Sequence, residues 1–109
     1  SLPLPPATFK TQLKTIVDEI LNAGKMAFIA KPPLIVGNPN KNNLLEDYNV
    51  QIDQLIVDYG SNNPVFAGPD FYTHFTTNTS EMNADGIHPN GNGYKSMGQL
   101  WSDAVDNQF

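Results

Sequence analysis

The sequence contains no cysteine and no arginine, and it has no long apolar run. Without cysteine, neither a disulfide framework nor a thiolate metal site or nucleophile can form. Eleven acidic residues against six lysines leave a net charge of −5, which argues against a surface that follows nucleic-acid phosphates. No apolar run approaches the roughly 20 residues needed to span a bilayer. The sequence therefore predicts no nucleic-acid partner and no membrane span.

The chain is short for a complete α/β domain. Its 109 residues allow at most one domain and fall below the roughly 150 residues typical of a sheet covered on both faces. The sequence is rich in Asn, Thr and Gly, and only 16% of its residues are charged. This composition favours a secreted or extracellular protein.

The apolar spacing predicts helices that alternate with short strands. We expect one helix capped by Thr8 and ended by Gly24, and a second capped by Asn42 or Asn43 and ended by Gly60. A third is expected from Asn92 or Gly93 to near Val105. The short apolar runs at residues 25–31 and 65–67 are typical of buried parallel strands. The order helix, strand, helix, strand, helix predicts an α/β fold with a parallel sheet.

The most informative stretch is Asp85-Gly86-Ile87-His88-Pro89. An aspartate three residues before a histidine, on a loop tightened by glycine and proline, can place its carboxylate against the imidazole Nδ1–H. Nε2 is then free to take a proton from a nucleophile. Because ordinary acidic surface loops also contain this spacing, the surrounding residues must decide between the two interpretations.

With Asn90, the glycines that follow and a C-terminal helix, this stretch resembles the last conserved block of the SGNH hydrolases, the GDSL-type esterases and lipases. The resemblance implies the C-terminal part of a three-layer α/β/α, flavodoxin-like fold with a parallel sheet. It also implies hydrolysis of carboxylic esters, with Asp85 and His88 as two members of a Ser-His-Asp triad. The proline-rich loop after the first strand would help to wall the substrate site through Pro32, Pro33 and Leu34, unless it is a plain connection.

The family's Gly-Asp-Ser block and its oxyanion-hole blocks are absent. We therefore expect residues 1–109 to be a single partial domain, inactive alone, whose partner is an N-terminal fragment carrying the serine or another copy of the chain. None of the local serines lies on the strained strand-to-helix turn that exposes a hydrolytic serine; these are Ser1, Ser61, Ser80, Ser96 and Ser102. The substrate would be a small-molecule, lipid or carbohydrate ester.

Other patterns do not predict a metal or cofactor. Two histidines without cysteine are a poor zinc site, and the alternating Asn38, Asn40 and Asn42 lack the central glycine of a calcium loop. His74 stands among aromatic residues and is expected to be a half-buried packing residue. A different function remains open: a non-catalytic carbohydrate- or protein-binding module that uses the aromatic residues between Phe71 and Phe75.

Overall fold

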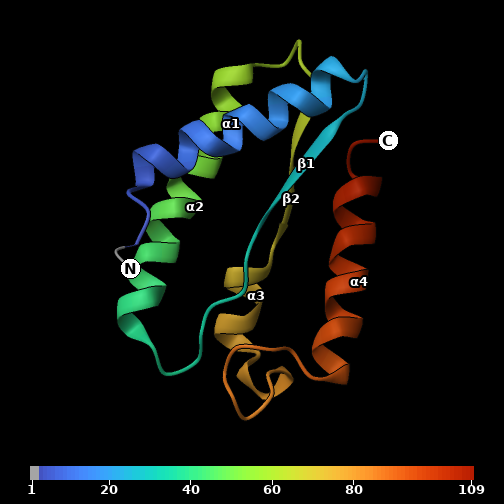
Figure 1. Ribbon diagram of the computed structural model, residues 1–109. Helices are drawn as coiled ribbons and strands as arrows, with labels where there is room; N and C mark the ends of the chain where they lie inside the picture. The colour runs from blue at the N-terminus through green and yellow to red at the C-terminus, as the bar shows by residue number, and fades with distance from the viewer. Residues whose placement is uncertain (1–2) are drawn as a thin grey trace.

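The structure is a computed structural model that describes residues 3–109, so Ser1 and Leu2 lie outside it. The elements in chain order are α1 (Pro6–Asn22), β1 (Ala27–Lys31), α2 (Pro39–Tyr59), β2 (Val65–Asp70), α3 (Phe71–Thr77), the 3-10 helix η1 (Thr79–Glu81) and α4 (Gly91–Asp106). β1 and β2 pair in parallel, with Ala27 opposite Val65. Figure 1 shows α1 and α2 on one side of the strands and α4 on the other. The predicted α/β fold with a parallel sheet is confirmed.

The two faces of the sheet bury different clusters because successive strand residues point to opposite sides. Ala27 and Ile29 pack with residues of α1 and α2, including Val17 and Leu55. Ala30 belongs to a second cluster, built around Phe71, Phe75 and Met82 with Met97, Leu100 and Trp101 of α4. This second cluster holds α4 beside the segment that precedes the Asp85–His88 pair.

Two helices begin earlier than the sequence predicts. α1 starts at Pro6 and not after Thr8, because the fixed φ of proline suits the first helical position. α2 starts at Pro39, and its cap is Asn38, whose side chain accepts a hydrogen bond from the Lys41 amide. The expected cap, Asn42, instead lies within α2.

α3 is not among the helices that the sequence predicts. Asp70 caps α3 by accepting a hydrogen bond from the Thr73 amide, and the aromatic face of the helix is buried through Phe71 and Phe75. Tyr94, in the first turn of α4, is exposed. α4 itself begins at Gly91 with Asn90 as its cap, one or two residues earlier than expected.

The molecule is less compact than is usual for a chain of its length. Its radius of gyration is 14.8 Å, whereas a compact chain of this length has about 13 Å. The sheet has two strands among the described residues, so each strand has one edge without a strand partner there. Large apolar side chains remain exposed, among them Ile16 on α1 and Met26 just before β1. No helix within residues 3–109 is long and apolar enough to cross a membrane.

Candidate functional site

Two loops meet at the carboxyl ends of the strands. Residues 32–38 follow β1, and residues 82–90 lie between η1 and α4, at the same end of the molecule (Figure 1). The Val36 amide donates a hydrogen bond of 2.9 Å to the Gly86 carbonyl oxygen, which joins the two loops directly. The Pro32-Pro33 loop and His88 therefore lie at the same edge of the sheet.

Asp85 and His88 face each other within the second loop. Asp85 Oδ2 lies 2.7 Å from His88 Nδ1. Asp85 Oδ1 accepts hydrogen bonds from the backbone amides of Ile87, at 2.9 Å, and of His88, at 3.0 Å. The His88 side chain is 65% exposed and the Asp85 side chain 46%. The carboxylate thus fixes the imidazole through Nδ1, while Nε2 makes no hydrogen bond within residues 3–109.

The same hydrogen bonds keep Asp85 ionised. The backbone amide of His88, followed by its imidazole and by the Ile87 amide, lowers the pKa of Asp85 from 3.8 to about 2. Hydrogen bonds to the charged form of a carboxyl favour that form. Asp85 is therefore a carboxylate at any pH at which a histidine can act as a base.

The loop that carries the pair is closed at its base. Met82 and Pro89 form an antiparallel bridge, and the Asn83 amide donates to the His88 carbonyl oxygen at 2.8 Å. Gly86 has a φ of +73°, and a Cβ there would lie 2.8 Å from the Val36 carbonyl oxygen. Both the left-handed conformation and the close approach of the other loop require glycine at this position.

Glu81, which the sequence did not single out, connects this loop to three helical elements. Its side chain lies at the end of η1, with Oε2 2.9 Å from Nε2 of His74 on α3. Its other oxygen, Oε1, accepts a hydrogen bond from the hydroxyl of Ser96 on α4. The Ser96 hydroxyl and then His74 lower the pKa of Glu81. No local pattern reveals this cluster, because the three residues are seven and fifteen positions apart.

The backbone of the same segment adds to the connection. The Glu81 carbonyl oxygen accepts from the Asn90 amide at 2.8 Å, and the Asn90 side chain donates to the Ser80 carbonyl oxygen at 2.8 Å. Glu81 and Asn90 therefore hold the two ends of the loop together from outside.

His74 is a half-buried packing residue, as the sequence predicts. Its ring meets Phe75 edge to face, with centroids 4.9 Å apart, and its side chain is 22% exposed. Its hydrogen bond to Glu81 is an addition to that prediction. The other histidine of the chain, His74, is thus held in a structural contact with Glu81.

The predicted substrate-lining residues differ in their surroundings. Pro32 is exposed and Pro33 is half-buried. Leu34 packs against the cluster of Phe71, Phe75 and Met82, so it supports the base of the site as part of the core. The loop itself is fixed by Asn42, whose side chain donates to the Ile35 carbonyl oxygen at 2.8 Å and accepts from the Ile35 amide at 2.7 Å. A role in lining the substrate site stays a prediction.

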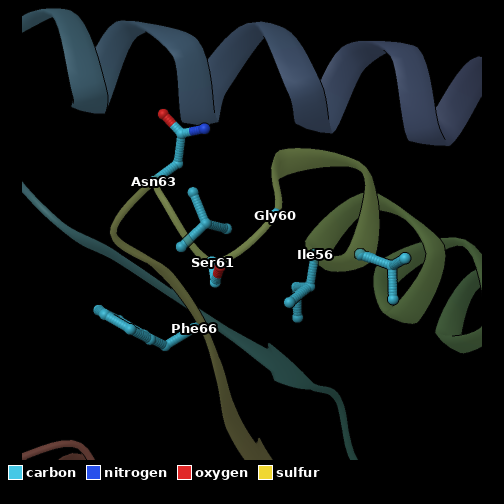
Figure 2. A pocket seen from close by; sticks show the side chains of 7 residues that line it. Ile56, Gly60, Ser61, Asn63 and Phe66 are labelled. Atoms are coloured by element: carbon cyan, nitrogen blue, oxygen red, sulfur yellow. The ribbon is translucent and has the colours of Figure 1, made fainter.

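The serines of residues 3–109 make no hydrogen bond to His88. Ser96 is held by Glu81. Ser61 lies in the turn between α2 and β2, at the opposite end of β2 from the His88 loop, where it lines an open apolar hollow of about 400 Å³ with Ile56 and Phe66 (Figure 2). Ser1 lies outside the described residues. Within residues 3–109, no group of three or more His, Asp or Glu side chains could hold a metal ion.

Comparison with known proteins gives a family match over nearly the whole chain. The family described as GDSL-like lipase/acylhydrolase matches residues 1–101. A curated relative, the "Multidomain esterase" of Ruminococcus flavefaciens, is 34% identical over 67 residues, which are 62% of this chain. The matched region covers 8% of the length of that relative. No solved structure matches the chain significantly.

Proposed function

This chain belongs to the GDSL-like lipase/acylhydrolase family, and we propose that it contributes two residues of a Ser-His-Asp triad to the hydrolysis of carboxylic esters. The observation that carries the proposal is the 2.7 Å contact between Asp85 Oδ2 and His88 Nδ1. It fixes the tautomer in which Nδ1 holds the proton and Nε2 is a base. The esterase name of the relative supports the same class of reaction.

In the proposed mechanism His88 is the general base. Nε2 takes the proton from a serine hydroxyl as the serine oxygen attacks the ester carbonyl, and it returns that proton to the leaving alcohol. Asp85 stays ionised and stabilises the imidazolium that forms in between. Donors that stabilise the tetrahedral oxyanion complete the site. Water then releases the acid from the acyl-serine with His88 again as the base.

The nucleophile and the oxyanion donors are proposed to come from a segment outside residues 1–109. Two observations support this: His88 makes no hydrogen bond to a serine within residues 3–109, and the matched region is 8% of the length of the relative. The edge of β1 that has no strand partner among the described residues, with the exposed Met26 just before it, offers the surface on which such a segment would pack. Pro32 and Pro33, on the loop bonded to Gly86, would then line the substrate site.

The test is ester turnover by the complete polypeptide that contains this chain, with p-nitrophenyl acetate as the substrate. His88→Ala should lower kcat by several powers of ten, because the general base is lost. Asp85→Asn should lower kcat by roughly 10³ to 10⁴. A large loss is expected because Asp85 is the partner of His88 Nδ1 among the described residues.

The matched control is His74→Gln, which changes the other histidine of the chain while keeping an amide N–H near the place where Nε2 of His74 meets Glu81. It should retain near-normal kcat in the folded protein. If His88→Ala turned over substrate as well as His74→Gln does, the triad assignment would be wrong. Circular dichroism of each variant separates loss of chemistry from loss of folding.

A further inference from the structure

The Asp85–His88 loop is a unit whose internal geometry is fixed by contacts within the loop. The carboxylate holds the imidazole through Nδ1, and the bridge between Met82 and Pro89 closes the loop at its base. In the proposed function the nucleophilic serine comes from a segment outside residues 1–109. The direction in which Nε2 of His88 points must therefore be set by the contacts between this loop and the rest of the fold.

Apolar packing holds the base of the loop against the core. Met82 is 7% exposed and forms a cluster with Phe71 and Phe75 of α3, against which Met97 of α4 also packs. Hydrophobic burial has no preferred direction. This packing keeps the loop in place but does not fix its angle, which needs directional contacts.

The Glu81 side chain makes directional contacts to two helices. Oε2 lies 2.9 Å from Nε2 of His74 on α3, and Oε1 accepts a hydrogen bond from the hydroxyl of Ser96 on α4. Within residues 3–109 no other side chain is hydrogen-bonded to both helices. Hydrogen bonds to a carboxylate are stronger than those between neutral groups. The Glu81 side chain is also only 17% exposed, so water competes weakly for these contacts.

Both partner residues lie on parts of the helices that the core holds firmly. Phe75, the residue after His74, is fully buried. Met97, the residue after Ser96, packs against the same apolar cluster. The position of the core is thus passed to Glu81 from two sides.

We propose that Glu81 is a positioning residue for ester hydrolysis: its carboxylate, held between α3 and α4, sets the angle of the Asp85–His88 loop and so aims Nε2 at the serine. The backbone of Glu81 extends this hold to the far end of the loop, because its carbonyl oxygen accepts a hydrogen bond from the Asn90 amide at 2.8 Å. The inference rests on the proposed function and adds to it a residue that acts only through the loop.

The experiment measures turnover of p-nitrophenyl acetate by the complete polypeptide that contains this chain. Glu81→Ala should lower kcat of the folded protein by about 10- to 100-fold, because a misplacement of about 1 Å can cost roughly 10²-fold. KM should stay unchanged. The midpoint of the acid limb of the kcat profile against pH should also stay unchanged, because this limb reports the ionisation of the base and the contact of Asp85 with His88 is local.

The control is Glu19→Ala, at an exposed position on α1, which should leave kcat unchanged. Circular dichroism gives the folded fraction and the melting temperature of each variant. If Glu81 served stability alone, Glu81→Ala would melt at a lower temperature but keep the normal kcat while folded.

Two smaller changes test whether the hydrogen bonds of Glu81 are the cause. Glu81→Gln keeps an oxygen for Ser96 and an amide N–H for His74, whose ring can accept it with its own proton on Nδ1. This variant should retain most of kcat. Ser96→Ala removes one of the two contacts and should fold, because alanine favours helices. It should lower kcat several-fold, but cause no further loss in the Glu81→Ala protein, since both changes break the same contact.

Three results would overturn the inference: kcat of Glu81→Ala equal to that of Glu19→Ala, a shifted acid limb in Glu81→Ala, or Glu81→Gln as slow as Glu81→Ala. If Glu81→Ala does not fold, Ser96→Ala decides in its place, and a normal kcat there overturns the inference. His88→Ala separates this inference from the proposed function. Near-normal turnover in His88→Ala removes the proposed function, whereas slow turnover there beside normal turnover in Glu81→Ala removes only the role of Glu81.

Discussion

The substitution of Gly93 by alanine is a sharp test of how the Asp85–His88 loop is held. Gly93 is buried in the first turn of α4. A Cβ at this position would lie 2.4 Å from the Glu81 carbonyl oxygen, 2.8 Å from Pro89 Cβ and 3.3 Å from a ring carbon of Phe75. The first of these neighbours is backbone, so the added methyl group cannot be accommodated by a side-chain rotation alone.

The change in stability expected for Gly93→Ala is opposite to the one that helix propensity predicts. Replacing glycine by alanine inside a helix normally stabilises the protein by about 1 kcal/mol. At Gly93, overpacking should instead cost roughly 1 to 3 kcal/mol, and α4 must move away from η1. The hydrogen bonds of Asn90 to Glu81 and Ser80 lie beside that contact, so the ends of the Asp85–His88 loop should separate.

Gly98 provides a matched control in the same helix. A Cβ at Gly98 would have no atom within 4 Å, so Gly98→Ala should stabilise by about 0.5 to 1 kcal/mol. In thermal unfolding, Gly93→Ala should melt below the unchanged protein and Gly98→Ala above it. Separations of several degrees are expected, because 1 kcal/mol corresponds to roughly 4 to 8 °C in a small domain. Gly93→Ala melting as high as Gly98→Ala would refute the packing argument.

Two further predictions concern the stability of the fold at low pH and the self-association of the chain. The folded-state pKa of Asp85, about 2, lies below its ordinary value of 3.8, so its hydrogen bonds contribute stability that is complete above pH 3.8 and lost as the pH falls through about 2. NMR titration should show the His88 amide signal moving in this acid range, and an unchanged movement in Asp85→Asn would contradict the assignment. The isolated 109-residue chain should sediment at micromolar concentration as a dimer or larger species, because the free edge of β1 and the exposed Met26 can associate. A compact, cooperatively unfolding monomer would show that no covering segment is needed.

The sequence predicts those parts of the fold whose causes are local. Gly24 and Gly60 follow the ends of α1 and α2 with positive φ, as glycines that end helices commonly do. The short apolar runs became parallel strands because their faces are covered from both sides. The contact between Asp85 and His88 is also local, since three residues and a tight turn suffice to bring the carboxylate to the imidazole.

The features that the sequence missed depend on distant partners. Asn42 looks like a helix cap, but its amide is used by Ile35 across the loop, and Asn38 takes the capping role. The segment from Phe71 to Thr77 has the aromatic and β-branched composition of a strand or loop. It forms α3 because Phe75 is fully buried under α4. Glu81 had no local signal at all, because His74 and Ser96 reach it only in the folded chain.

The closure of the segment from Met82 to Pro89 has a consequence for how such sites can change. The bridge between Met82 and Pro89, with the Asn83 amide on the His88 carbonyl, makes the geometry of Asp85 and His88 a property of eight successive residues. Insertions or substitutions elsewhere, in the loop after β1 or in α3, would tilt or shift this unit as a whole while the carboxylate kept its hold on the imidazole. Divergence among relatives can thus re-aim Nε2 of His88 without changing the contact between the carboxylate and the imidazole.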